Sequence, residues 1–415
     1  SFADQANNSN AQAVFGPYNF DNEAPKMEFG PNGSDDYEKH YDVEVKFPDG
    51  DQGQIDNIEY VWTKGTDTTP DFDKDGKPVV IGGGEDGKTI IPSPDDATGN
   101  DWYLNVKVTD EFGNEETVKV GPFYIDNSGP TITKPTGDYS TPQKSHTVTV
   151  KVEDTASGMP GNTPKYVWVN GNGTPTEDEL KAGTTFTSES PITTPSGENG
   201  NNWHLWIYAE DNLGNSSTEN IGPFNIDNTA PSITFKPNGN TGSWQQSYSV
   251  KVDAADSNAG VKADTLKYQW TQSSSAPSAE SFNTNGTSFT SGSNISSPAD
   301  VTGNNWYLWI YAQDNAGNSN IVGTTKPFYI DNTDPNLSLE VIGTATSNTI
   351  NIQANATDGD SGINDSSYRY YIKETHGGNY GSAETDGKTH RFEDLEQNTE
   401  YTIMVEVADN AGNTI

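Results

Sequence analysis

The chain has 415 residues, and 60 acidic against 23 basic side chains give it a formal net charge of −37. This balance argues against nucleic acid or an anionic membrane surface as a partner. The chain has no cysteine, which excludes disulfides, zinc–thiolate sites and thiol nucleophiles. Only 30% of the residues are hydrophobic, yet 9 Trp and 19 Tyr in alternating runs indicate short half-buried strands rather than a disordered coil.

Three sequence motifs recur with a period of about 100 residues. The junction motif is FDNEAP at 20–25, IDNSGP at 125–130, IDNTAP at 226–231 and IDNTDP at 330–335. The turn motif is TDEFGN at 109–114, EDNLGN at 210–215, QDNAGN at 313–318 and ADNAGN at 408–413. A third motif precedes the turn, with TGNDWYLNV at 98–106, NGNNWHLWI at 199–207 and TGNNWYLWI at 302–310. The chain is therefore a tandem repeat.

Each repeat is predicted to be an antiparallel β-sandwich. In the second repeat, alternating runs separated by Gly, Pro, Asn and Ser clusters predict strands at 146–154, 165–169, 203–209 and 222–226. The helix-like stretch at 176–182 is too short to change this interpretation. Several short strands per hundred residues indicate an all-β immunoglobulin-like fold.

The two ends of the chain match parts of the repeat. Residues 2–22 align with 208–228, so 1–23 are assigned to the F–G hairpin end and G strand of a preceding domain. Domains are expected at 24–126, 127–228, 229–332 and 333–415, the last without its final strand. Either the chain was cut at equivalent points of a longer repeat, or residues 11–20 complete the fourth domain of another copy and build a head-to-tail filament.

The fourth repeat resembles a fibronectin type III domain, because Leu395 precedes Tyr401 by six residues in the run 395–409, as at the E–F corner of that family. The pairing of DNAGN-type turns with IDNTAP-type junctions resembles the tandem bacterial immunoglobulin-like (Big-type) domains of large surface adhesins, S-layer proteins and accessory regions of secreted enzymes. That resemblance implies an elongated rod of sandwiches at the bacterial cell surface or cell wall. The resemblance predicts the domain architecture specifically but says little about the activity.

Strand alternation assigns most aromatic side chains to the core. With Trp203 and Trp306 at the corner position, every second residue after them is expected to face inward, and Trp62, Trp168 and Trp270 resemble the core Trp of immunoglobulin folds. The opposite face is left with two outward ring pairs, Trp206 with Tyr208 and Trp309 with Tyr311. These rings either form a surface that stacks on a sugar or a protein, or are covered by long side chains of a neighbouring strand.

The sequence contains none of the common catalytic motifs. The five histidines do not have metal-ligand spacing; they are His40, His146, His204, His376 and His390. There is no GxSxG, no phosphate loop and no GxGxxG before a helix. We therefore expect no enzymatic activity.

Acidic residues recur in phase with the junctions. An Asp follows each junction Asp by 27 to 29 residues, after the second strand, and the turn motif supplies another. In this topology the B–C and F–G loops lie beside the incoming linker, so three carboxylates are expected to meet there, as in the cadherin-type junctions they resemble. The expected Ca²⁺ ligands are Asp21, Asn22, Asp49 and Asp110; Asp126, Asn127, Asp154 and Asp211; Asp227, Asn228, Asp256 and Asp314; and Asp331, Asn332, Asp358 and Asp409.

Turn chemistry is the alternative explanation, because Asp and Asn form hairpin turns without a metal. It accounts for the turn motif but not for the phased Asp after the second strand. A separate possible metal loop, with Asp71, Asp73 and Asp75, matches the first half of an EF-hand, but Gly82 stands where that loop needs Glu. An ordinary polar turn is the alternative there.

The sequence as a whole predicts a calcium-stiffened stalk of a bacterial surface protein, used for adhesion or for assembly of a surface layer or filament. Its expected partners are other copies of itself or other surface proteins, and glycans are a further candidate. The competing hypothesis is a set of carbohydrate-binding or spacer modules of a secreted carbohydrate-active enzyme. A catalytic domain elsewhere in the parent protein would favour that hypothesis.

Overall fold

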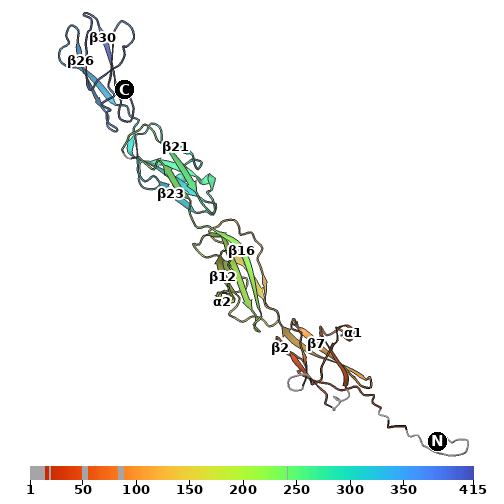
Figure 1. Ribbon diagram of the computed structural model, residues 1–415. Helices are drawn as coiled ribbons and strands as arrows, with labels where there is room; N and C mark the ends of the chain where they lie inside the picture. The colour runs from red at the N-terminus through yellow and green to blue at the C-terminus, as the bar shows by residue number, and fades with distance from the viewer. Residues whose placement is uncertain (1–14, 18–19, 49–54, 83–87, 241) are drawn as a thin grey trace, which may run out of the picture. The chain divides into compact units, whose positions relative to one another are not determined.

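The computed structural model describes residues 15–17, 20–48, 55–82, 88–240 and 242–415. Its contacts divide the chain into two compact units, Ser1–Gly137 with Thr147–Ile192 and His204–Ile221, and Asp138–His146 with Thr193–Trp203 and Gly222–Ile415. This division passes through the second repeat, so the domain boundaries given above stay a prediction. Within the described residues, each repeat contributes two groups of strands (Figure 1).

In the first repeat, one sheet has the order β1-β3-β6 and the other β2-β8-β7-β4-β5. The strands are β1 (Glu28–Gly30), β2 (Ser34–Glu38), β3 (Asp42–Lys46), β4 (Ile55–Lys64), β5 (Lys77–Pro78), β6 (Thr89–Pro92), β7 (Thr98–Asp110) and β8 (Glu115–Asp126). Val43, Leu104 and Phe123 are fully buried and belong to one core cluster drawn from both sheets. Alternating inward side chains of two facing sheets are the defining feature of an immunoglobulin-like sandwich.

In the second repeat, the longest sheet has the order β13-β12-β15-β16, and shorter pairs β9 with β11 and β10 with β14 make up the opposite layer. The strands are β9 (Thr131–Thr133), β10 (Thr147–Thr149), β11 (Lys151–Glu153), β12 (Lys165–Asn170), β13 (Thr184–Thr185), β14 (Pro191–Thr193), β15 (Gly200–Glu210) and β16 (Ser216–Ile226). Trp203, Leu205, Ile207 and Ala209 are buried, as the alternation predicted.

The third repeat has sheets in the orders β17-β18-β21 and β20-β19-β22-β23, with β24 also paired to β22. The strands are β17 (Ser232–Lys236), β18 (Ser249–Ala255), β19 (Lys267–Thr271), β20 (Thr287–Ser288), β21 (Asn294–Ser296), β22 (Gly303–Gln313), β23 (Ser319–Gly323) and β24 (Phe328–Ile330). Leu308, Ile310 and Ala312 are fully buried, and Trp270 and Trp306 are half-buried against the core.

The fourth repeat has sheets β25-β26-β29 and β28-β27-β30. The strands are β25 (Asn336–Val341), β26 (Ile350–Thr357), β27 (Arg369–Glu374), β28 (Glu384–Thr385), β29 (Thr389–Phe392) and β30 (Tyr401–Glu406). The hydroxyl oxygen of Tyr401 accepts a hydrogen bond from the backbone N–H of Glu396 at 2.9 Å, and Leu395 packs against the core. This corner is the one that the fibronectin-like spacing of the two residues predicted.

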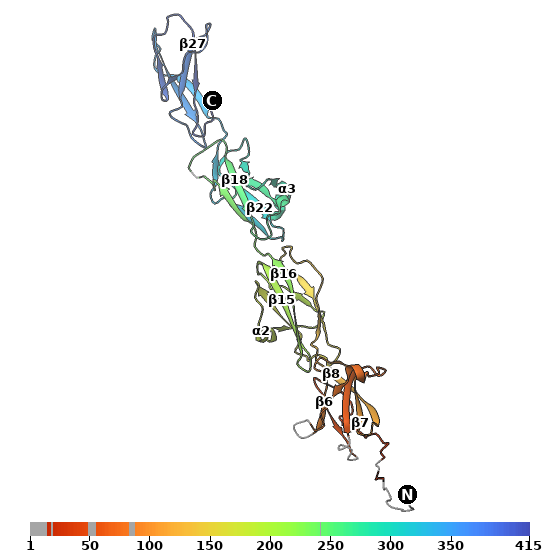
Figure 2. The same cartoon turned by 45° about the vertical axis from the view of Figure 1, so that its right-hand side comes forward.

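In each of the first three repeats, a short helix precedes the short edge strand: it lies between β4 and β5, between β12 and β13, or between β19 and β20. They are α1 (Phe72–Asp75; labelled in Figure 1), α2 (Glu177–Lys181) and α3 (Ala279–Asn285; both labelled in Figure 2). A 3-10 turn, η2 (Ala263–Thr265), precedes β19. The stretch at 176–182 forms α2, and although it leaves the all-β fold unchanged, α2 contributes Leu180 and α3 contributes Phe282 to the buried residues. Lys181 of α2 lies over the ring of Tyr208 in β15, and Phe282 of α3 lies beside the ring of Tyr311 in β22, so these two helices pack on outward side chains of the longer sheet.

We expect Thr176→Ala to lower the free energy of unfolding by about 1 kcal/mol, a typical loss for a helix cap. Thr176 and Glu179 form a reciprocal capping box: the Thr176 hydroxyl accepts from the Glu179 N–H at 3.3 Å, and the Glu179 carboxylate accepts from the Thr176 N–H at 2.8 Å. Urea unfolding measures the loss. Thr174→Ala, at an exposed position in the same loop, is the matched control and should be neutral.

Candidate metal site

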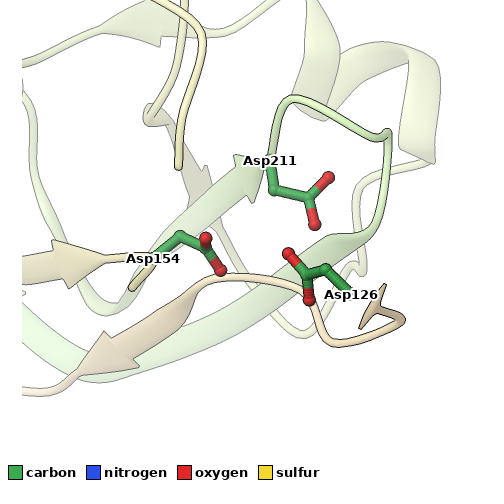
Figure 3. Close-up of side chains that lie close together, drawn as sticks. All are labelled: Asp126, Asp154 and Asp211. Carbon is green, nitrogen blue, oxygen red and sulfur yellow. The ribbon is translucent and has the colours of Figure 1, made fainter. Parts of the chain in front are cut away.

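Three of the four predicted carboxylate groups come together in the structure. We call them the second-repeat triad (Asp126, Asp154, Asp211), the third-repeat triad (Asp227, Asp256, Asp314) and the fourth-repeat triad (Asp331, Asp358, Asp409). In each triad, one carboxylate oxygen from every residue lies within 4.8 Å of the others. Figure 3 shows the three side chains of the second-repeat triad converging from separate segments. For the first repeat, Asp49 lies outside the described residues, so that predicted group stays a prediction.

The first member of each triad, the linker Asp, is fully buried at the end of the last strand of a repeat. One carboxylate oxygen of Asp227 accepts from the N–H of Thr229 at 3.0 Å, and the other accepts from the N–H of Ala259 at 2.8 Å. Its backbone carbonyl accepts from the side-chain amide of Asn318 at 2.9 Å. The loops of the following repeat therefore hold this linker residue at two atoms, one carboxylate oxygen and the backbone carbonyl, while the linker itself supplies the third bond.

The second member, the B–C Asp, has one carboxylate oxygen to spare. Oδ1 of Asp154 accepts from the N–H groups of Ala156 at 3.1 Å and Gly158 at 2.7 Å. Among the described residues, no hydrogen-bond donor contacts its Oδ2. Gly158 has φ +75°, a left-handed conformation that favours glycine.

This loop has a sequence signature that spacing alone did not reveal. It is Asp-x-x-[Ser/Ala]-Gly, at 154–158, 256–260 and 358–362. The residue before the glycine donates its backbone N–H to the linker Asp: Ser157 to Asp126, Ala259 to Asp227 and Ser361 to Asp331. The recurring glycine was the available signal, because it marks a fixed loop conformation rather than a simple turn.

The third member, the turn Asp, organises the F–G turn from a buried position. Oδ1 of Asp211 accepts from the N–H groups of Leu213 and Asn215, both at 2.8 Å, and Oδ2 accepts from the side-chain amide of Asn215 at 2.6 Å. The same amide donates to the carbonyl of Asp126 at 3.0 Å. The turn motif therefore both forms the F–G turn and attaches the linker. The residues that make this attachment were not identified from the sequence; they are Asn215, Asn318 and Asn413, whose side-chain amides each donate to the backbone carbonyl of a linker Asp.

The triads concentrate negative charge without compensation. Among the described residues, no Lys, Arg or His nitrogen forms an ion pair with any of the nine triad carboxylates. Burial raises the pKa of Asp154, and the neighbouring charges of Asp126 and Asp211 raise it further. In the fourth repeat, burial and then the charges of Asp331 and Asp358 raise the pKa of Asp360 in the same way. A divalent cation would relieve this repulsion.

This raised pKa predicts an unusual pH dependence. Because folding raises the pKa of Asp154 above its ordinary 3.8, the folded state binds this proton more tightly than the unfolded chain does. In calcium-free buffer, the contribution of Asp154 to stability should therefore increase as pH falls from 7 through the folded pKa. Urea unfolding at pH 7 and pH 5 checks this by comparing the wild type with Asp154→Asn, which should lack that increment; equal pH slopes in the two proteins would contradict it.

The junction asparagines are placed differently from the expectation. The side-chain nitrogens of Asn127, Asn228 and Asn332 each donate to two backbone carbonyls of the preceding repeat. For Asn127 these are the carbonyls of Lys39 at 2.8 Å and Ala97 at 3.1 Å. The structure therefore gives these amides a bracing role. These bonds account for the side-chain nitrogens alone, so calcium binding by the junction asparagines stays a prediction. Asn22 is exposed.

The possible EF-hand-like loop does not assemble. Asp71 is the N-cap of α1, with its carboxylate accepting from the N–H of Lys74 at 3.1 Å, and Asp73 and Asp75 are exposed. Within the described ranges, these three carboxylates do not gather as a group of possible metal ligands. The ordinary polar turn is the better description, in the form of a capped helical turn.

The outward ring pairs are largely covered. Tyr208 is only 3% exposed, its hydroxyl donates to Glu210, and burial followed by that hydrogen bond raises its pKa to about 12. The ring of Tyr311 lies 5.8 Å from that of Phe282 in α3. Trp206 and Trp309 are half-buried, and the Trp309 ring lies so close to Gly323 that a Cβ there would come within 2.7 Å. Tyr208 is therefore a mostly buried side chain at the edge of a small cavity of about 190 Å³, and a ligand surface made by these ring pairs stays a prediction.

No protein-family model matches the chain, and a search of curated proteins found no match. Among solved structures, domains A168–A170 of titin match at 12% identity over 69% of this chain and 94% of theirs, with a TM-score of 0.29. The human desmocollin-1 ectodomain matches at 13% identity over 94% of this chain and 78% of its own, with a TM-score of 0.24. Bacteroides ovatus SGBP-B, solved in complex with a mixed-linkage heptasaccharide, matches at 9% identity over 94% of this chain and 99% of its own, with a TM-score of 0.19. Likenesses with TM-scores this low support no function for this chain.

No helix in the described residues has the length and apolarity needed to cross a bilayer.

Proposed function

We propose that this chain is a non-enzymatic stalk segment of a bacterial cell-surface protein, stiffened by Ca²⁺ at its junction triads. Its task would be adhesion or the assembly of a surface layer or filament. The observation that carries this proposal is the recurrence of an uncompensated carboxylate triad at the same position of successive repeats. An isolated acidic cluster is common on protein surfaces, whereas each of these triads is built from a buried linker residue and two loops.

The donor set fits calcium. Ca²⁺ binds six to eight oxygens at roughly 2.3–2.6 Å, so two of its ligands lie at most about 5 Å apart. The triad oxygens lie within 4.8 Å of one another. The free oxygen of each B–C Asp would bind the ion directly, the linker Asp and turn Asp would supply the other carboxylates, and water or carbonyl oxygens would complete the shell.

Such an ion would bind a linker residue and two loops of the following repeat at once. It would therefore oppose bending at the junction, because bending requires the linker Asp to move away from these loops. A stalk needs this property, since thermal bending shortens its reach.

Small-angle X-ray scattering and thermal unfolding, each with excess calcium and with chelator, test the proposal. Four sandwiches with strands of about 10 residues, rising about 3.3 Å per residue, predict a maximum dimension of about 150 Å in calcium. In chelator we expect a shorter average dimension and a lower melting temperature. Identical dimensions and melting temperatures in both conditions would contradict the proposal.

The three triads should differ in affinity. The third loop position is Ala156, Asn258 or Asp360, so the fourth-repeat triad has an additional carboxylate beside it. Because more ligand charge tightens calcium binding, we expect Asp360→Asn to weaken binding at this triad on the order of tenfold. Calorimetric titration checks this in a chain whose other described triads carry Asp154→Asn and Asp256→Asn; an unchanged affinity would contradict it.

A further inference from the structure

A groove of about 720 Å³ opens on the side of the third sandwich, between the edges of its two sheets. Tyr268 and Trp270 of β19 and Phe289 after β20 supply its aromatic surface. Asn285 at the end of α3, Thr287 of β20 and Asn294 of β21 supply polar side chains. Figure 2 shows α3 and β22 of this sandwich. The groove is separate from the junction triads and involves none of their residues.

The aromatic surface is held in place before any ligand arrives. The indole N–H of Trp270 donates to the carbonyl of Ser296 at 3.0 Å and so links the two sheets. The Trp270 ring meets Phe328 of the core edge-on at 5.3 Å, and Tyr268 meets Phe289 edge-on at 6.3 Å. A rigid aromatic surface binds with a small loss of conformational entropy.

The lining of this groove is uncharged. None of its thirteen residues is Asp, Glu, Lys or Arg, although charged residues make up 20% of the chain. The side chains of Asn285, Thr287 and Asn294 make no hydrogen bond within the described residues, so their amide and hydroxyl groups are available. This combination excludes an ionic ligand as the best fit and favours a neutral one that has both hydroxyl groups and apolar C–H faces.

In two other repeats, the tyrosine at the position of Tyr268 has a different neighbour. In the first repeat, the ammonium group of Lys77 lies 6.0 Å above the ring of Tyr60. In the fourth repeat, His390 stacks on Tyr370 with ring centroids 4.8 Å apart. The third repeat places neither a cation nor a second stacked ring on Tyr268, among the described contacts of that residue.

We propose that this groove binds a neutral oligosaccharide. Sugar rings would lie against Tyr268 and Trp270 through their C–H faces, and sugar hydroxyls would bond to Asn285, Thr287 and Asn294. A volume of 720 Å³ is within the range of ligand pockets, about 300–1,000 Å³, and suits a short stretch of a glycan chain.

The test is calorimetric titration of the whole chain with cellohexaose, laminarihexaose, maltohexaose and chitohexaose, each with calcium and with chelator. At least one should bind, with a dissociation constant in the micromolar to millimolar range, equally well in both conditions. This independence from calcium separates the groove from the proposed stalk function. If no member of the panel binds, the proposal is overturned.

Variants then locate the site. Asn285→Ala combined with Asn294→Ala should weaken binding at least tenfold and leave the melting temperature unchanged, because both side chains are exposed. Asn283→Ala, exposed on the same helix but outside the groove, is the matched control and should bind normally. Full binding by the double variant, or equal binding of a polyanionic glycan such as polygalacturonate, would overturn the proposal.

Discussion

Replacing Asp256 by asparagine should remove the calcium-dependent stability of the third repeat. At free calcium one hundred times the dissociation constant, an occupied site adds about 2.7 kcal/mol to the free energy of unfolding. Asparagine retains the oxygen that accepts from the N–H groups of Asn258 and Gly260 at 3.1 and 2.8 Å. It loses the charge and the spare oxygen, so stability in chelator should not fall and should rise by whatever repulsion within the triad is relieved.

Urea unfolding with calcium and with chelator, together with terbium luminescence, checks this expectation. Tyr329 lies two residues before Asp331 and pairs with Trp244 at 5.2 Å, so these rings can sensitise terbium bound at the fourth-repeat triad and serve as an unaffected reference. Asp264→Asn, at an exposed position in the same repeat, is the matched control. If Asp256→Asn keeps the full calcium increment, the triad does not bind the ion.

Replacing Asp227 by alanine should cost more, and without any metal. The carboxylate is fully buried and accepts from two backbone N–H groups, those of Thr229 and Ala259. Hydrogen bonds to a charged group are worth about 1.5–3 kcal/mol each, so losing both predicts a loss of about 3–6 kcal/mol. Asp227→Asn keeps one acceptor oxygen and should lose about half as much.

This series is measured by urea unfolding in chelator, so that calcium binding does not contribute. Asp334→Ala, at an exposed position in the next junction, provides the reference for an Asp-to-Ala change on the surface. Equal losses for Asp227→Ala and Asp227→Asn would contradict the assignment of the cost to the number of acceptor oxygens that remain.

The fold and the clustering of the triad carboxylates could be predicted from the sequence, because both depend on regular spacing along the chain. Strand alternation placed Leu205 and Ile207 in the core, and the constant distance from junction Asp to B–C Asp placed both at one end of a sandwich. These inferences need only the topology of the fold, which the repeated motifs specify.

The details that could not be predicted depend on hydrogen-bond direction and on short elements. Asn127 recurs with the same period as Asp126, but only the structure shows its amide on the carbonyls of Lys39 and Ala97. Likewise, α2 is five residues long, and its propensity gave no indication that Leu180 would be buried. Periodicity identifies which residues matter together, whereas the partner of each polar atom is set by tertiary packing.

The attachment of each linker Asp has a consequence for the order in which the chain matures. The carboxylate and carbonyl of Asp227 are bonded by Ala259 and Asn318, which leave the ribosome after it. A junction can therefore become ordered only when the repeat that follows it has folded, even though the repeat before it is already complete. During synthesis, the linker at Asp227 would stay accessible to proteases until Asn318 bonds its carbonyl. Folding of each repeat therefore protects the linker that precedes it.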